Sequence, residues 1–318
     1  MQSEDAEYRF SQIHIDAARN ATDDFNPFHD PYKWKAIKEN PFGSTIVLGF
    51  QLEALIEYRL SLHRAASGES KLVSQNGLNF SNYQFSFADI VRPGESIRVD
   101  IKTSAKSISP ALQLSNRIVV RKNKSPVVVG RVLETKVPVV SPDSNFDGMG
   151  NMRKLNDRSF IENGRYFLKR KFMNTSNAKN FLAGSLVDQH HYFDELEDRV
   201  QFSGIFPVSL LSCALLEKAK LEEYDFFKDP MVYVSHSISV DLPSLDRLKS
   251  NDFLHILVEE LQHPRNTKGL GETDIPQTIY RCFGLLDNNK ILFRARVSMA
   301  RLKDIVATKA KKQSMAAQ

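Results

Sequence analysis

The order of apolar and polar positions divides the chain into two halves that repeat the same series of elements. In each half, apolar residues at helical spacing predict one helix, over 49–63 and again over 206–220. Four strand-like segments follow each helix. In the first half, the last two have the β-branched content and the alternation typical of antiparallel strands with one buried face. The predicted strands are 82–87, 96–102, 112–121 and 127–137 in the first half, and 231–240, 253–261, 278–286 and 291–299 in the second.

One helix followed by four strands, present twice, is an internal repeat. Short connections between most neighbouring strands favour antiparallel pairing over a doubly wound parallel sheet, so we expect an α+β fold in which each sheet wraps around a central helix. Residues 141–157 are rich in Ser, Asp, Asn and Gly and are typical of a linker. The predicted organisation is a repeat at 1–140, this linker, a second repeat at 158–302 and a basic tail at 303–318.

Composition narrows the class of protein. With 318 residues, 42% of them hydrophobic, the chain is long enough for two cores. The formal charge of +5 is spread along the chain except in the tail, which does not indicate nucleic acid and fits a phosphate-bearing small molecule. No apolar run approaches the roughly 18 residues of a membrane span. The two cysteines, Cys213 and Cys282, lie in apolar stretches and suggest reduced residues of a cytoplasmic protein.

The most informative chemistry lies before the first predicted helix, in residues 23–30, DDFNPFHD. A carboxylate, an amide and an imidazole occur within six residues, around a proline that fixes the chain in a turn. Such a loop can direct Asp24 and His29 at one water molecule, as an acid/base pair requires. The same residue types are also ordinary turn and capping residues, and this alternative stays open.

A second motif leads directly into the helix, at residues 42–49, FGSTIVLG. Two glycines that flank a short apolar stretch allow a backbone to approach a ligand closely. The unpaired N–H groups at a helix start can stabilise an anion, including a thioester enolate oxygen. Alternatively, Gly49 only relieves crowding where the helix enters the sheet.

Together these motifs resemble the signature of the MaoC-like (R)-specific enoyl-CoA hydratases. The family pattern is Asp-x-Asn-Pro-x-His followed by Gly-x-Pro-Ile-Ala-His-Gly, and this chain has DFNPFH at 24–29 and GSTIVLG at 43–49. Residues 87–95, FADIVRPGE, are similar to the family's Phe-x-x-Pro-Val-x-Pro-Gly-Asp. The resemblance covers about residues 8–138. It implies a hot-dog fold for this half, and with the repeat it implies a double hot dog.

The resemblance also implies a reaction, the reversible hydration of a trans-2-enoyl thioester of coenzyme A or acyl carrier protein to the (R)-3-hydroxyacyl form. Asp24 and His29 would activate the water, Asn26 would brace the loop, and the Gly49 N–H would hold the thioester oxygen. No metal or redox cofactor, nucleic acid or membrane insertion is implied. The residues expected to bind substrate are Phe25, Ile46, Val47, Leu48 and Arg92, the last of them through phosphates.

The chain departs from the family pattern at three positions. Asp23 replaces a small residue, and Thr45 and Leu48 replace the proline and the histidine before the second glycine. A carboxylate at 23 either raises the pKa of Asp24 by like-charge repulsion or points into solvent. These changes leave the Asp24 and His29 pair intact and bear on substrate choice and turnover.

The second half carries a weaker copy of the motif at 182–190, LAGSLVDQH. Gly184 and His190 match the pattern, but Ser185 stands at the position of the acid. We therefore expect a degenerate second repeat that completes an internal pseudo-dimer, with a homodimer of the whole chain also open. The neighbouring polar residues 188–195 include metal-ligand types, but their spacing fits no familiar metal site.

Two other functions remain compatible with the sequence. One is a hot-dog acyl-CoA thioesterase, in which a carboxylate on the central helix, Glu53 or Glu57, drives hydrolysis. The other is a non-catalytic acyl-binding protein, which the replacements Thr45 and Leu48 would suit. Release of free coenzyme A distinguishes the thioesterase, and binding without turnover distinguishes the binding protein.

Overall fold

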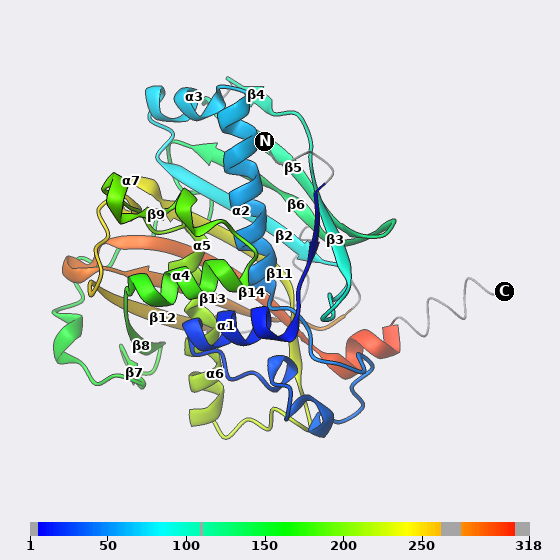
Figure 1. The fold of residues 1–318 in the computed structure, drawn as a ribbon. Coiled ribbons are helices and arrows are strands. Elements are labelled where there is room, and N and C mark those ends of the chain that lie inside the picture. The colour runs from blue at the N-terminus through cyan, green and yellow to red at the C-terminus, as the bar shows by residue number, and fades with distance from the viewer. Residues whose placement is uncertain (1–5, 109–110, 262–274, 309–318) are drawn as a thin grey trace.

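A computed structural model describes residues 6–108, 111–261 and 275–308. Its main feature is a twelve-stranded sheet in which every neighbouring pair of strands is antiparallel (Figure 1). The strand order is β1-β3-β5-β6-β2-β11-β14-β13-β12-β8-β7, with β4 paired to β5. The predicted basic tail at 303–318 lies outside the described residues from 309 onward.

The first half contains three helices and six strands within the described residues. They are β1 (Glu7–Arg9), α1 (Gln12–Thr22), α2 (Gly49–Ala66), α3 (Glu69–Gln75), β2 (Phe80–Phe87), β3 (Ser96–Ile101), β4 (Ala105–Ser107), β5 (Gln113–Lys122) and β6 (Ser125–Thr135). In the second half, the sheet strands are β7 (Ser159–Ile161), β8 (Tyr166–Phe172), β11 (Met231–Asp241), β12 (Phe253–Leu261), β13 (Thr278–Leu285) and β14 (Ile291–Arg301). Its other elements are α4 (Thr175–Gly184), β9 (Phe193–Asp194), β10 (Arg199–Val200), α5 (Ile205–Ser209), α6 (Leu211–Leu221) and α7 (Leu242–Leu245).

The two halves join at β2 and β11, which pair from Phe80 with Asp241 to Ser86 with Ser235. Outward from this seam the order is β6, β5, β3, β1 on one side and β14, β13, β12, β8 on the other. The same order of strands on both sides confirms the predicted α+β fold with an internal repeat. All eight predicted strands are present, with ends that differ by at most two residues.

The central helices differ between the halves. Helix α2 is buried around most of its circumference, including Phe50, Leu52, Leu55 and Ile56, because the sheet encloses it. The helix predicted at 206–220 is instead two helices, α5 and α6, that meet at Leu210.

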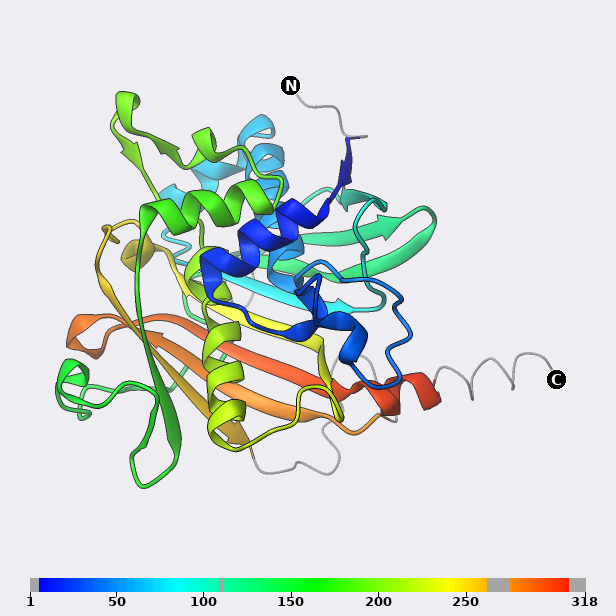
Figure 2. The same cartoon turned by 60° about the horizontal axis from the view of Figure 1, so that its bottom comes forward.

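Sequence reasoning missed two helices that lie side by side, α1 in blue and α4 in green in Figure 2. Each precedes the motif loop of its half. They approach closely because Gly184 has no side chain: a Cβ there would lie 2.6 Å from the His14 carbonyl oxygen and 2.8 Å from the Ala18 nitrogen. The buried face of α1 consists mainly of small residues, namely Ala18, Ala21 and Thr22, together with Ile15.

The predicted linker packs against the second half. Phe146 and Met152 are buried in a small apolar cluster with Tyr166, Leu168 and Phe283. None of the described helices combines the length and apolarity that crossing a membrane requires.

Candidate functional site

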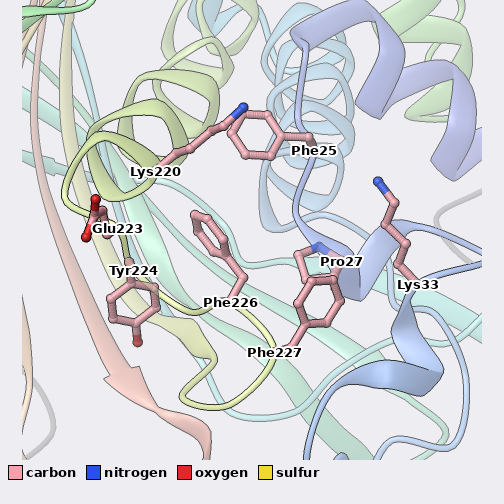
Figure 3. Close-up of a pocket in the computed structure, with 8 residues that line it drawn as sticks. All are labelled: Phe25, Pro27, Lys33, Lys220, Glu223, Tyr224, Phe226 and Phe227. Carbon is pink, nitrogen blue, oxygen red and sulfur yellow. The ribbon is translucent and has the colours of Figure 1, made fainter.

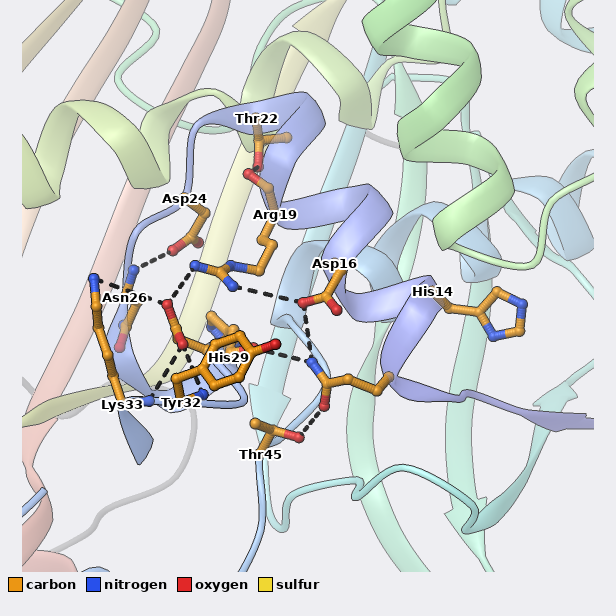
Figure 4. Close-up of polar contacts among 12 residues, drawn as sticks. His14, Asp16, Arg19, Thr22, Asp24, Asn26, His29, Tyr32, Lys33 and Thr45 are labelled. Atoms are coloured by element: carbon orange, nitrogen blue, oxygen red, sulfur yellow. Dashed lines mark hydrogen bonds and ion pairs between the residues drawn. The ribbon is translucent and has the colours of Figure 1, made fainter. Parts of the chain in front are cut away.

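The motif loop is shaped by its own side chains (Figure 4). Helix α1 ends at Thr22, and the next residue, Asp23, adopts the left-handed conformation with φ 55° and turns the chain. The Asp24 carboxylate then accepts a hydrogen bond of 2.9 Å from the Asn26 N–H, and the Asn26 side chain accepts one of 3.1 Å from the Phe28 N–H. Asp24 and Asn26 therefore do act as turn residues. Asn26 braces the loop, and Pro27 begins the short 3-10 turn that ends at His29.

The ring of His29 is held in one orientation. Its Nδ1 lies 2.8 Å from the Ile46 carbonyl oxygen. A carbonyl only accepts hydrogen bonds, so Nδ1 carries the hydrogen and Nε2 presents a lone pair. Burial lowers the pKa of His29, and the negative charge of Asp24 opposes that shift. At neutral pH the imidazole is uncharged, as a general base must be.

Asp24 and His29, on the same loop, are both buried. Their exposed fractions are 5% and 7%, and the charge of Asp24 acts on the imidazole. A neighbouring ion pair fixes the loop that carries them: Arg19 on α1 donates to the Asp30 carboxylate at 2.9 Å. Burial opposes ionisation of Asp30, but hydrogen bonds from the Tyr32 N–H and Arg19 hold its pKa below the usual range. Sequence reasoning did not identify Arg19 or Asp30.

Thr45, one of the departures from the family pattern, ties the second motif to the first. Its hydroxyl donates to the Gln12 side-chain oxygen at 2.5 Å. The Gln12 amide in turn donates to the His29 carbonyl oxygen at 3.3 Å and to Asp16 at 3.1 Å. Thr45 therefore links residues 43–49 to the backbone of His29 through Gln12.

Leu48, the other departure, is buried just before α2. Its backbone N–H donates to the Gln51 side-chain oxygen at 3.0 Å. The Gln51 amide donates to the carbonyl oxygens of Gly184, at 2.6 Å, and His14, at 3.1 Å. One fully buried glutamine thus connects α2 with both α1 and α4, and it positions the start of α2.

Gly49 begins α2, and the structure supports the interpretation that a glycine relieves crowding at this position. A Cβ there would lie 3.1 Å from the Phe87 ring and 3.8 Å from the Tyr233 ring, so the glycine does relieve crowding against the sheet. Within the described part of the chain, the N–H groups of Gly49 and Phe50 have no hydrogen-bond acceptor. They remain suitable donors for an oxyanion.

The second half contributes to the same region through Tyr233 on β11. Its hydroxyl lies 2.9 Å from the Ser212 hydroxyl on α6. Burial raises the pKa of Tyr233, and the charge of Asp24 raises it further. Neither Tyr233 nor Ser212 was identified from the sequence, because only tertiary structure brings β11 beside the loop.

Asp23 pairs with Lys171, a largely buried lysine on β8 of the second half. Its carboxylate therefore faces a cation. The ion pair also fastens the end of α1 to the second half.

The residues predicted to bind substrate occupy different places. Phe25 lines two hollows, of about 330 and 450 Å³ (Figure 3). Ile46 and Val47 are buried in the core, and the Ile46 carbonyl holds His29. Arg92 binds the Phe42 carbonyl oxygen at 2.7 Å and Glu95 at 3.1 Å, and it lines neither hollow.

No family model matches the sequence, and no curated protein matches it. Solved structures do match its fold. A MaoC-like dehydratase covers 93% of this chain and 96% of its own, with 9% identity and a TM-score of 0.53. A conserved Mycobacterium tuberculosis protein with a double hot-dog fold covers 93% and 94%, with 11% identity and a TM-score of 0.53. A putative MaoC-domain dehydratase from Chloroflexus aurantiacus covers 93% of each chain, with 10% identity and a TM-score of 0.54.

The chain has a double hot-dog fold. Because the two halves repeat the same fold, the motif loop of the second half can be compared with that of the first, position by position. Asp188 caps the turn Gln189–His191 and accepts from the His190 N–H at 3.0 Å, as Asn26 does from Phe28. Counted from these caps, His191 and not His190 stands at the position of His29. By this structural comparison, the sequence alignment of the second motif is shifted by one residue at this histidine.

The helix start of the second hot dog is already occupied. The Glu57 carboxylate accepts hydrogen bonds from the N–H groups of Gly204, at 2.7 Å, and Ile205, at 3.2 Å. Burial raises the pKa of Glu57 to about 7. Glu53, the other carboxylate of the thioesterase alternative, is fully buried and lies 2.8 Å from His236 Nδ1. The carboxylates of Glu57 and Glu53 therefore both already have hydrogen-bond partners within the protein.

Among the described residues, no group of three or more His, Cys, Asp or Glu is placed to hold a metal.

Proposed function

We propose that this double hot-dog protein is a MaoC-like acyl-thioester hydratase/dehydratase. It would add water to a trans-2-enoyl thioester and give the (R)-3-hydroxyacyl thioester. The observation that carries this proposal is the buried pair of Asp24 and a neutral His29 with its Nε2 lone pair available. The fold shared with MaoC-like dehydratases supports it.

The chemistry follows from these groups. Asp24 and His29 position a water and remove its proton, so that the hydroxyl adds to the β-carbon of the enoyl group. The electrons of the double bond move toward the thioester oxygen, where the Gly49 N–H at the start of α2 stabilises the developing charge. One member of the pair then delivers a proton to the α-carbon. Only the first repeat is active, because Glu57 occupies the helix start of the second.

The direct test is a hydration assay with crotonyl-CoA and longer enoyl-CoA thioesters, followed by loss of the conjugated-enoyl absorbance. Asp24→Asn and His29→Ala should each lower the rate by about 10²–10⁴-fold, as expected when an acid/base group is lost. His190→Ala changes the exposed histidine of the second repeat and serves as the matched control, within a few-fold of wild type.

Each variant must keep the wild-type thermal transition before its rate is interpreted. Normal rates in either Asp24→Asn or His29→Ala would remove that residue from the mechanism. Free coenzyme A detected with a thiol reagent would identify a thioesterase instead. Binding of an enoyl thioester without any turnover would identify an acyl-binding protein.

A further inference from the structure

A row of polar side chains runs across the sheet and over the seam between the two halves. Strand pairing places its members directly opposite one another on six neighbouring strands, from β5 to β13. Side chains that are directly opposite in a ladder point to the same face of a sheet. In order across the strands, this arginine row consists of Arg117, Arg131, Gln84, Ser237, Arg296 and Arg281.

The arginine row lies on the face of the sheet that turns away from α2. A neighbouring residue in each strand points the other way. Tyr83, beside Gln84, is buried, and its hydroxyl donates to Glu57 on α2 at 3.3 Å. In Figure 1, α2 lies over that opposite face. Three members of the row, Arg117, Arg131 and Arg296, are exposed, so the row is open to a partner and is no part of the candidate site.

The four arginines of the row form two like-charged pairs. Arg117 stands directly opposite Arg131, and Arg281 stands directly opposite Arg296. Like charges directly opposite each other destabilise a sheet, so this arrangement costs the fold stability. Of the four, only Arg281 has a carboxylate partner among the described residues, because its Nε donates to Glu259 at 2.7 Å.

The same face carries further donors without an anionic partner. Arg294 precedes Arg296 by two residues on β14, so its side chain points the same way. Its exposed fraction is only 9%, and its Nε and Nη1 have no hydrogen-bond partner in the part of the chain that the structure describes. Between the two arginine pairs, the Gln84 oxygen accepts from Arg131 at 2.8 Å, which leaves the Gln84 amide hydrogens as donors.

We propose that the arginine row docks a carboxylate-rich segment of a partner protein, laid across the strands. Guanidinium groups bind carboxylates through two parallel hydrogen bonds, a geometry that lysine cannot offer. Carboxylates on such a segment would neutralise both like-charged pairs. The stability that these pairs cost the free protein would then be recovered on binding.

Three other occupants fit the row less well. A second copy of this chain using the same face would bring arginines against arginines. A membrane surface takes up apolar side chains, and no exposed large apolar side chain of the described residues lies on these six strands. A nucleic acid strand stacks its bases on aromatic rings, and the row contains none.

The probe is a fluorescein-labelled peptide in which glutamate alternates with alanine. A peptide of about twelve residues, when extended, carries its glutamates on one side over about 40 Å, whereas five strand intervals of the row span about 24 Å. Fluorescence anisotropy at low salt should show binding. Added salt should weaken it by screening, and the same peptide with glutamine in place of glutamate should not bind.

Arg131→Glu combined with Arg296→Glu should raise Kd by about tenfold or more, because two attractive charges become repulsive. Each substitution also turns a like-charged pair into an oppositely charged one, so the thermal transition should stay level or rise. The matched control is Lys71→Glu combined with Lys220→Glu, exposed positions on α3 and α6. It changes the net charge equally and should leave Kd within about twofold of wild type.

Equal losses of affinity in the arginine and lysine variants would show that the peptide senses only net charge and would overturn the inference. Absence of peptide binding to wild type would do the same. A lower thermal transition in the arginine variant would assign the row to the stability of the sheet instead.

The other occupants are tested with the same variants. Tighter, arginine-dependent binding of oligothymidylate, or of vesicles of phosphatidylcholine and phosphatidylserine, would overturn an acidic protein segment as the occupant. Arginine-dependent self-association of the chain would identify a second copy. None of these outcomes depends on whether the protein hydrates a thioester.

Discussion

At the scale of single residues, the candidate site combines two requirements that usually oppose each other. Burial keeps the His29 ring in the neutral form that can accept a proton, but a buried ring needs a fixed hydrogen-bond partner. The Ile46 carbonyl supplies that partner and selects the tautomer. The Asp24 carboxylate is held in position by the hydrogen bond that it accepts from the Asn26 N–H. These contacts are those of ordinary turn-forming residues, and they also fix the orientation of the Asp24 and His29 side chains. The interpretation as turn residues is therefore compatible with the interpretation as an acid/base pair.

His29 makes the pH dependence of activity predictable. Its lowered pKa means that the ring loses its proton below the ordinary value of 6.5. If His29 is the base, kcat/KM for an enoyl-CoA should rise with pH, with its midpoint below 6.5, and stay level through neutral pH. A profile of kcat/KM from pH 4.5 to 8 checks this. A midpoint above 6.5 would exclude His29 as the base in the free enzyme.

At the scale of elements, the position of α1 matters because the motif loop follows directly from it. Three contacts hold α1 against the second half: the Asp23 ion pair with Lys171, the Gln51 hydrogen bonds, and the close approach of α4 at Gly184. Each comes from an element remote in sequence. The second repeat therefore positions the site of the first, although its own loop lacks the acid.

Gly184→Ala tests the contact between α1 and α4. The added methyl group would meet the His14 carbonyl oxygen at 2.6 Å, so the helices must separate. We expect a loss of about 1–3 kcal/mol in the free energy of unfolding, typical of overpacking, together with a lower kcat. Chemical denaturation and the hydration assay measure both. Gly148→Ala, which has no atom within 4 Å of its added Cβ, is the control and should change neither.

Glu57 makes stability depend on pH. Its folded pKa of about 7 exceeds its ordinary value of 4.5, so between these values the folded protein holds a proton that the unfolded chain has lost. The free energy of unfolding must then fall as pH rises from 4.5 to 7. For a pKa shift of this size, the free energy of unfolding should fall by up to about 3 kcal/mol over this range. Glu57→Gln has no ionisable group at this position and should not show this decline.

Urea denaturation of wild type and Glu57→Gln at pH 5 and pH 7.5 measures the difference. Glu197→Gln, an exposed carboxylate on the second half, should leave the wild-type decline in place. Equal declines in wild type and Glu57→Gln would show that Glu57 ionises normally in the folded protein.

At the scale of the whole molecule, the two hot dogs share one sheet and one core. Besides the strand pairing of β2 with β11, a fully buried pair crosses the seam: Glu53 on α2 and His236 on β11, 2.8 Å apart. The Phe50 ring stacks on the imidazole with centroids 4.8 Å apart. The halves are therefore joined by specific polar contacts as well as by apolar packing.

Removing either member of this pair should destabilise the protein strongly. Glu53→Ala or His236→Ala leaves a buried polar group without its partner, at a cost of about 3–5 kcal/mol. The double variant should cost less than the sum of the two single variants, since neither group is then left unpaired. Chemical denaturation of wild type, the two single variants and the double variant gives the coupling free energy between the two side chains. Additive losses would show that the two side chains do not stabilise each other.

The sequence alone determined the elements whose signals are local. Strand-like patterns identified eight of the twelve described strands of the main sheet and missed β1, β4, β7 and β8. The turn chemistry of residues 24–29 placed Asp24 and His29 on one loop. The helices α1 and α4, which pack against each other, were not predicted. The break between α5 and α6 was likewise not evident from apolar spacing alone.

Only tertiary structure decided how these pieces act together. It joined Tyr233 on β11 to Ser212 on α6, paired Asp23 with Lys171, gave the second helix start to Glu57 and bound Arg92 to Glu95. None of these contacts leaves a periodic or compositional trace, because each joins residues far apart in the chain or depends on the direction of a side chain. A sequence pattern fixes which face of an element is buried, but the partner on that face is set by the packing of the whole molecule.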